Sequence, residues 1–194
     1  SQDGSASLID LRDNRIISPL NHDAGITWGG FSPDGKLVVT ASEDGFAKVW
    51  DATTGELTGE PLAHGDRIRC AAFSRDGTRL ATGGWDKKAR IWSLQERRQL
   101  TEPMAHENSI PSLSFSPDDR FLVTASLDHT ARVWDTQTGE EAAPAMQHGF
   151  ILQNVEFLPD GKHVMTASAD RTVRIWSLNL DPNRGVIVKQ DAGI

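Results

Sequence analysis

The 194-residue chain contains a single cysteine, Cys70, and no tyrosine. One cysteine excludes an intramolecular disulfide, so the fold needs none, which is typical of a reducing, cytoplasmic setting. No stretch approaches the roughly 18 apolar residues of a membrane-spanning helix. The first residues lack the charged start and apolar core of a signal peptide. We therefore expect neither a membrane segment nor a disulfide-stabilised fold.

Positive charge is also scarce. Lys and Arg number 20 against 27 Asp and Glu, which gives a net charge of −7 and a pI near 5.3. General binding of nucleic acid or acidic lipid needs a basic surface, so neither is expected, and only a local basic patch is compatible with this balance. The motifs GxxxxGK[ST], GxGxxG after a strand, HExxH and CxxC are absent. We expect no cofactor and no metal site.

What the chain does contain is one segment repeated four times. Residues 106–134 run from a histidine to a tryptophan, and the same pattern recurs at intervals of 42 positions in residues 22–50, 64–92 and 148–176. Four copies at one constant period indicate a structural repeat. Hydrophobic residues make up 38% of the chain and helical periodicity is nearly absent, so we expect a globular, all-β protein.

Each repeat is predicted to be a four-stranded antiparallel meander. An apolar segment follows the histidine and is expected to be buried on both faces. A turn such as SPDG leads to a second strand, a turn such as EDG to a third strand that ends at the tryptophan, and TTGE to a more polar fourth strand. The first two strands are predicted at residues 26–31 and 37–42, 68–73 and 79–84, 110–115 and 121–126, and 152–157 and 163–168.

The same pattern predicts the boundaries of the repeats. Residues 3–10 are a degenerate copy of residues 44–51, and residues 15–20 are predicted to form one further strand ended by Pro19. These two strands would make a partial unit that lacks its first two strands. The predicted units are the partial unit (residues 1–21), unit 1 (22–63), unit 2 (64–105), unit 3 (106–147) and unit 4 (148–194), with a last strand at 185–189.

The residues at the ends of each repeat identify a family resemblance. The dipeptides Trp50-Asp51 and Trp134-Asp135, their counterparts at Trp92 and Trp176, and a histidine 28 residues before each tryptophan resemble the WD-repeat β-propellers. The resemblance covers residues 3–176, although glycine does not precede the histidines. It implies a β-propeller with four full four-stranded blades plus a two-strand partial blade at the N-terminus, acting as a non-enzymatic scaffold for protein–protein interaction.

The resemblance also implies a role for four polar positions in every unit. In WD repeats an aspartate, a histidine, a threonine and a tryptophan form a hydrogen-bonded chain within the blade, which satisfies buried polar groups together. The residues at these positions are His22, Thr40, Asp44 and Trp50; His64, Thr82, Asp86 and Trp92; His106, Thr124, Asp128 and Trp134; and His148, Thr166, Asp170 and Trp176.

A histidine beside an aspartate is also the arrangement of an acid–base pair or a hydrolytic triad. Enzymes rarely repeat such a pair in every unit, so we favour the structural role and predict no catalytic residue. Zinc binding by the histidines is disfavoured, because a 42-residue spacing around a ring places them far apart. His129 and His163 fall outside the pattern and are predicted to lie at the surface.

Specificity must then come from positions that vary between units and face outward. The resemblance places the residues on either side of the first-strand isoleucine, and the residue before the turn aspartate, on one face of the ring, called here the top face. In unit 2 they are Arg67, Arg69 and Trp85, types enriched at binding hot spots. Alternatively, Trp85 packs against its own loop and the arginines are solvated. The predicted partner-binding set is Glu43, Arg67, Arg69, Trp85, Leu127 and Ile151.

Three functional hypotheses remain open at this point. The favoured one is a cytoplasmic interaction scaffold with a protein or peptide partner, either part of a larger regulatory or signalling protein or completed by a second copy of the chain. The second is a propeller hydrolase or small-ligand sensor that uses the ring centre. The third is a structural unit whose function is self-assembly, because a partial unit leaves a strand edge and an apolar face uncovered.

Overall fold

The structure of the protein, a computed structural model, describes residues 2–12, 14–181 and 185–193. These ranges contain β-strands and no helix, which confirms the all-β class. Accordingly, the described ranges include no helix that could cross a membrane.

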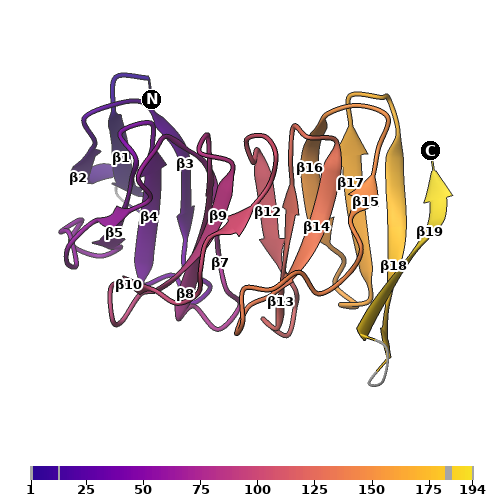
Figure 1. The fold of residues 1–194 in the computed structure, drawn as a ribbon. Coiled ribbons are helices and arrows are strands. Elements are labelled where there is room, and N and C mark those ends of the chain that lie inside the picture. The colour runs from indigo at the N-terminus through magenta and orange to yellow at the C-terminus, as the bar shows by residue number, and fades with distance from the viewer. Residues whose placement is uncertain (1, 13, 182–184, 194) are drawn as a thin grey trace.

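The strands form antiparallel sheets that follow one another along the chain (Figure 1). In the partial unit, β1 (Ser5–Asp10) pairs with β2 (Arg15–Asn21). Unit 1 contains β3 (Ile26–Phe31), β4 (Leu37–Ser42), β5 (Phe46–Asp51) and β6 (Leu62–Ala63). Unit 2 contains β7 (Ile68–Phe73), β8 (Arg79–Gly84), β9 (Lys88–Ser93), β10 (Arg98–Gln99) and β11 (Met104–Ala105). Unit 3 contains β12 (Ser112–Phe115), β13 (Phe121–Ala125), β14 (Thr130–Asp135) and β15 (Met146–Gln147), and unit 4 contains β16 (Leu152–Phe157), β17 (His163–Ser168), β18 (Val173–Asp181) and β19 (Gly185–Gly193).

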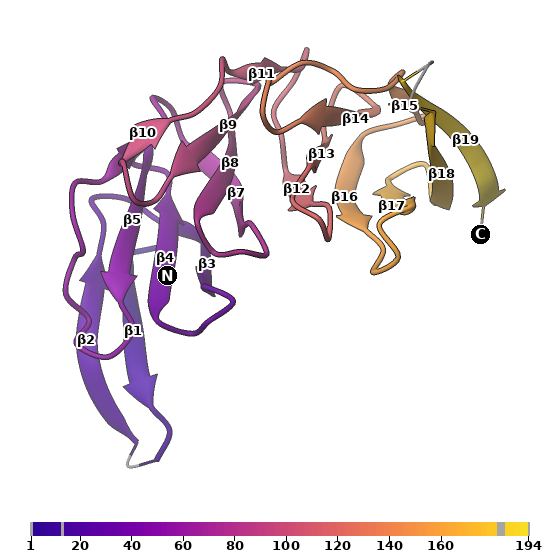
Figure 2. The ribbon, with the colours of Figure 1, turned by 90° about the horizontal axis from the view of Figure 1, so that it is seen from below.

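Seen from below, the sheets lie along an open arc (Figure 2). The first strands β3, β7, β12 and β16 lie on its concave side, and the short strands β10, β11 and β15 lie on its convex side. The two ends of the arc, β1–β2 and β18–β19, lie apart. The predicted repetition of antiparallel sheets is thus confirmed, whereas the described residues do not close into a ring.

The fourth strand departs most from the predicted pattern. In units 1 to 3 it is reduced to two-residue strands and isolated bridges, such as Trp50 to Leu57. Pro61 and Pro103 stand just before β6 and β11, and a proline has no amide hydrogen to donate to a ladder. For the same reason β12 begins at Ser112, after Pro111, rather than at residue 110. Pro19 does not end β2, which is an edge strand and continues to Asn21.

The first strands differ in how far they are buried. On β7, the neighbouring residues Cys70 and Ala71 point to opposite faces of the sheet and are both buried, as expected. On β16, Val155 and Phe157 are buried on one face, whereas Asn154 and Glu156 on the other face are exposed. This second face lies at the end of the arc, where no further sheet of the described residues covers it.

The core is a series of interfaces between consecutive sheets. Side chains alternate along a strand, so each sheet has a rear face toward the preceding unit and a forward face toward the next. Val39 and Val49, on the forward face of unit 1, are at most 1% exposed and lie in one cluster with Trp92 of unit 2. Trp50, on the rear face of unit 1, packs with Leu8 of the partial unit. Each unit therefore depends on its neighbours for its burial.

Unit 4 lacks this cover on its forward face. In units 1 to 3 the apolar residues of that face on the second and third strands are at most 1% exposed, as at Ile91 and Val133. The equivalent residues of unit 4 are only partly buried; they are Met165, Ala167, Val173 and Ile175. An apolar sheet face thus remains uncovered at this end of the arc.

Candidate functional site

The predicted chain of polar residues is assembled in every unit. In unit 1 the indole N–H of Trp50 donates to Thr40 Oγ1 at 2.8 Å, and His22 Nε2 lies 2.7 Å from the same hydroxyl. His22 Nδ1 lies 2.7 Å from Asp44 Oδ2. The hydroxyl accepts from the indole and donates to the imidazole, whose other N–H donates to the carboxylate. One threonine therefore joins the third strand to the loop that begins the unit.

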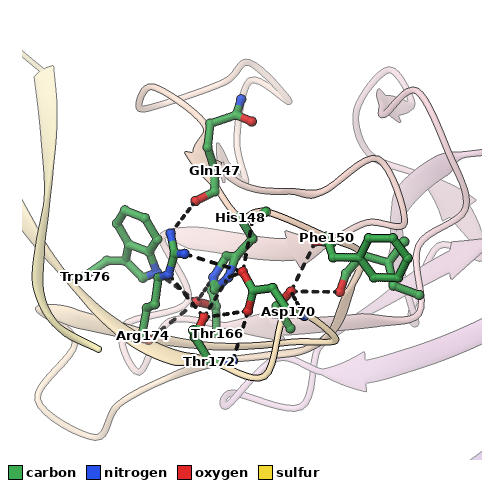
Figure 3. Close-up of polar contacts among 11 residues, drawn as sticks. Gln147, His148, Phe150, Thr166, Asp170, Thr172, Arg174 and Trp176 are labelled. Carbon is green, nitrogen blue, oxygen red and sulfur yellow. Dashed lines mark hydrogen bonds and ion pairs between the residues drawn. The ribbon is translucent and has the colours of Figure 1, made fainter. Parts of the chain in front are cut away.

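Unit 4 has the same arrangement, shown in Figure 3, with Trp176 Nε1 2.8 Å and His148 Nε2 2.7 Å from Thr166 Oγ1. Asp170 also accepts from the hydroxyl of Thr172 at 2.6 Å and from the backbone N–H of Gly149 at 3.0 Å. The aspartate thereby ties the turn after the second strand to the loop that follows the histidine. The hydrogen-bonded chain of aspartate, histidine, threonine and tryptophan therefore fixes the two loops that carry the variable top-face positions.

Unit 2 holds its loops differently. The ring of His64 is reversed, with Nδ1 2.8 Å from Thr82 Oγ1 and Nε2 3.1 Å from Asp86 Oδ1. Arg90 donates to the other oxygen of Asp86 at 2.6 Å. Gly84 replaces a serine here, and a Cβ at this position would lie 2.4 Å from His64 Nε2. The serine of unit 1, Ser42, donates to a loop carbonyl at 2.9 Å, and unit 2 lacks this link.

The four histidines are inaccessible to a substrate. Their side chains are 0% exposed, and both ring nitrogens of each lie within hydrogen-bond distance of a partner. A general base must reach the proton that it removes, so this geometry favours the structural role over acid–base chemistry. Within the described ranges, no group of three or more His, Cys, Asp and Glu side chains is placed to hold a metal ion.

In units 1 and 4, burial favours the neutral form of the histidine beside its aspartate. Burial lowers the pKa of His22 and of His148, and the neighbouring aspartates only partly oppose this shift. Burial would raise the pKa of Asp86, but hydrogen bonds from His64 and Arg90 outweigh it and hold this pKa at about 2. For Asp128, too, hydrogen bonds outweigh burial and hold the carboxyl pKa well below its usual range.

The predicted top-face positions form adjacent pairs within each unit. The residue before the turn aspartate donates its backbone N–H to the carbonyl of the residue before the first-strand isoleucine or leucine. The pairs are Glu43 to Gly25 (2.9 Å), Trp85 to Arg67 (2.9 Å), Leu127 to Ser109 (3.0 Å) and Ala169 to Ile151 (2.9 Å). The structure thus brings Arg67 and Trp85 together, with Glu43 one unit before them and Leu127 and Ile151 in the two units after them.

The side chains of unit 2 form what we call the Trp85 platform, composed of Arg67, Arg69 and Trp85. The guanidinium carbon of Arg69 lies 5.0 Å from the ring centroid of Trp85, and its NH1 donates to Ser109 Oγ at 3.1 Å. Trp85 is 50% exposed and Arg67 is exposed. Trp85 is therefore not packed away in its own loop, and Arg69 is held across the boundary between units 2 and 3.

The sequence-based set missed Phe150. Its ring lies 5.6 Å from that of His129 and is 51% exposed, so it extends the apolar surface next to Ile151. His129 itself is partly buried by this contact rather than freely exposed, and His163 is partly buried and lies 2.6 Å from Asp160. The residues equivalent to Phe150 in the other units are Ala24, Asp66 and Asn108. Phe150 could have been found from the sequence, because the second position after the histidine also varies between units.

Two further stabilising contacts were also missed. A basic residue stands two positions before every tryptophan, and Lys48 and Arg174 donate to the carbonyl just before the histidine, at 2.8 and 2.9 Å. Asp119 takes the place of a turn glycine with φ 59° and accepts from the backbone N–H groups of Arg75 (2.7 Å) and Asp76 (2.9 Å). The first contact had a recurring signal in the sequence, whereas the second depends on which turns the fold places side by side.

Comparison with known proteins gives the family. The family described as WD domain, G-beta repeat matches residues 15–51, 55–93, 97–135 and 147–177, which together exceed half of the chain. The chain therefore belongs to the WD-repeat family, whose domains are generally interaction modules rather than enzymes. Apoptotic protease-activating factor 1 of Mus musculus is 34% identical over 56 residues, which are 28% of this chain and 4% of that protein. The chain thus matches only a small part of the length of that relative.

The first prediction concerns the central hydroxyl of unit 3. Thr124→Val keeps the shape of the side chain but leaves the buried indole N–H of Trp134 and a ring nitrogen of His106 without a partner. We expect the free energy of unfolding in urea to fall by roughly 2–5 kcal/mol, since each unpaired buried group costs about 1–3 kcal/mol. Thr124→Ser is the control, because it retains the hydroxyl and should lose clearly less. Equal losses in the two variants would show that the hydroxyl is not the important group.

The second prediction concerns pH. The folded pKa of His22 and of His148 lies below the ordinary value of 6.5, so the unfolded chain binds more protons. Stability from these groups is fully present above pH 6.5 and is lost as the pH falls through the folded pKa values. We expect their imidazole resonances to titrate below pH 6.5 in NMR. We also expect the urea concentration at the midpoint of unfolding to be lower at about pH 5 than at about pH 7.5. Titration midpoints at or above 6.5 would contradict this.

Proposed function

We propose that the chain is a segment of a WD-repeat β-propeller that acts as a non-enzymatic interaction scaffold and binds a protein or peptide through the Trp85 platform. The observation that carries this proposal is the stack of Arg69 on the half-exposed ring of Trp85, anchored to Ser109. A tryptophan that is both exposed and held in place loses little side-chain entropy when it binds a partner.

The charges around the platform support an acidic partner. Arg67, Lys87 and Lys88 are exposed beside Trp85 in a chain whose net charge is −7. Arginine pairs with carboxylates through two parallel hydrogen bonds, and Trp85 offers its face to an apolar group. Leu127 and Ile151 are partly buried and Phe150 is half exposed, so they continue the apolar surface into units 3 and 4. The best-fitting ligand is a peptide segment with Asp or Glu next to an apolar side chain.

The burial of the four histidines makes a hydrolase the weaker candidate. Among the residues that the structure describes, no contact specifically favours a small-ligand sensor at the ring centre. The single buried cysteine supports a cytoplasmic setting, and family membership supports a place within a larger regulatory or signalling protein.

The third prediction tests the platform. A peptide library selected against the protein should yield binders rich in Asp and Glu with an apolar residue beside them. For a selected peptide, Arg67→Ala with Trp85→Ala should raise Kd in fluorescence titrations at least about tenfold, as expected for hot-spot residues. The matched control is Lys36→Ala with Arg75→Ala, which changes two exposed cations in the turns after the first strands. Peptides that bind wild type and the platform variant equally would remove this surface from the proposal.

A second candidate, self-association, is favoured by one specific observation. The forward face of unit 4 leaves Val173 and Ile175 only partly buried, whereas their counterparts in units 1 to 3 are at most 1% exposed. Burial of such a face by a second copy would release water from apolar surface.

The fourth prediction follows from this face. Light scattering should show the mass rising with concentration from 21.2 kDa toward twice that value, and Ile175→Lys should keep the chain at 21.2 kDa. A wild-type chain that stays at 21.2 kDa at all concentrations would count against pairing.

A further inference from the structure

The boundary between units 3 and 4 carries an apolar surface that the equivalent boundaries lack. Here the turn after the second strand of unit 3 lies beside the loop before the first strand of unit 4. The backbone N–H of Leu152 donates to the carbonyl of Ser126 at 3.2 Å, and the ring centroids of His129 and Phe150 lie 5.6 Å apart. We call this surface the Phe150 patch, which consists of Leu127, His129, Phe150 and Ile151.

The other boundaries show that the fold does not require this composition. The equivalent residues are Glu43, Gly45, Asp66 and Arg67 between units 1 and 2, and Trp85, Lys87, Asn108 and Ser109 between units 2 and 3. Only the third boundary has four apolar or aromatic side chains. Phe150 contacts unit 3 through His129, so its exposure does not result from the uncovered forward face of unit 4.

The two rings of the patch are held in place by backbone contacts on both sides of the boundary. Phe150 is 51% exposed, and in Figure 3 its ring points away from the hydrogen-bonded side chains of unit 4. The carbonyl of Phe150 accepts from the hydroxyl of Ser168 at 3.2 Å, and the carbonyl of His129 accepts from the backbone N–H of His148 at 2.9 Å. Little conformational entropy is therefore lost when a ligand binds to these rings.

The chemistry of the patch suits an aromatic side chain with a polar tip. Phe150 offers an exposed ring, next to the partly buried side chains of Leu127 and Ile151. Aromatic rings favour offset or edge-on contacts with one another. Within the described ranges, neither imidazole nitrogen of His129 has a hydrogen-bond partner. A phenol hydroxyl donates or accepts, so it pairs with an imidazole nitrogen in either tautomer. Tyrosine combines the two groups.

We propose that the Phe150 patch is a second anchor site, which binds a tyrosine of the same acidic peptide segment that the Trp85 platform binds. This inference rests on the proposed function. Ser109 makes the surface continuous, since its hydroxyl accepts from Arg69 at 3.1 Å and its carbonyl accepts from the backbone N–H of Leu127 at 3.0 Å. The acidic part of the segment lies on unit 2, and its tyrosine lies over the boundary between units 3 and 4.

N-acetyl-tyrosinamide tests the patch without the platform. In NMR it should shift the ring resonances of His129 and Phe150 in a saturable way, and N-acetyl-leucinamide should bind less tightly. Phe150→Asn, which introduces the residue type that unit 3 has at Asn108, should abolish the shift of His129. Phe46→Asn is the matched control, because Phe46 is 40% exposed and lies outside the patch. The absence of a saturable shift in the wild-type protein would overturn the proposal.

A linked peptide tests whether the two sites share one ligand. A peptide selected on the Trp85 platform is extended by a Gly-Ser spacer of varied length that ends in Tyr, Phe or Ala. At the best length the Tyr peptide should bind at least about tenfold more tightly than the Ala peptide, because the second contact becomes intramolecular. Phe150→Asn should remove this gain, and Phe46→Asn should retain it.

The role of His129 has its own test. The Tyr peptide should bind about threefold more tightly than the Phe peptide, as one added hydrogen bond allows. His129→Gly should make the two affinities equal; glycine suits the φ of 74° and is the residue of unit 1, Gly45.

The failures of the two proposals differ. A platform peptide that gains nothing from tyrosine, or whose gain survives Phe150→Asn, would overturn the second anchor and leave the proposed function intact. If no selected peptide depends on Arg67 and Trp85, the proposed function fails, and the shared segment fails with it.

Discussion

One threonine hydroxyl per unit is the contact on which the rest of the structure depends. It accepts from the indole of the third strand and bonds the imidazole from the loop that starts the unit, and all of these groups are buried. A buried polar group left unpaired costs free energy, so the four hydrogen-bonded residues of a unit are expected to come together, or to be disrupted, as one group. Because the aspartate at its end also binds loop backbone, the same contact that holds the sheet together positions the loops of the top face.

This coupling separates constant from variable residues. The histidine, threonine, aspartate and tryptophan recur in all four units, while the residues that the loops present differ between units. Unit 2 departs furthest, with a reversed His64 ring and Gly84 in place of serine. That same unit carries the Trp85 platform. The hydrogen bonds that hold the loops therefore differ most in the unit that carries the Trp85 platform.

Much of the fold can be predicted from the sequence, because four copies of one repeat can be compared with each other position by position. The period of 42 residues, the turn motifs and the alternation of apolar residues predict the sheets and most strand bounds. The resemblance to WD repeats implies which polar side chains meet. The short fourth strands were not predicted, because nearby prolines interrupt a ladder whose residues otherwise suit a strand. The stack of Arg69 on Trp85 within unit 2 depends on side-chain conformations that the sequence does not specify. The bond of Arg69 to Ser109 and the pairing of His129 with Phe150 are contacts between units, about which a single repeat carries no signal.

The carboxylate of Asp119 has a consequence for how the array deforms. It caps two backbone N–H groups in the turn of unit 2, and Arg79 reaches back to the carbonyl of Asp119 at 2.9 Å and to Thr136 at 3.0 Å. At the opposite face, the bond between Arg69 and Ser109 crosses the same boundary. In a quasi-one-dimensional array, unequal coupling between neighbours decides where opening starts. A boundary that is tied at both faces resists opening, so we expect units 2 and 3 to separate less readily than an end unit separates from the array.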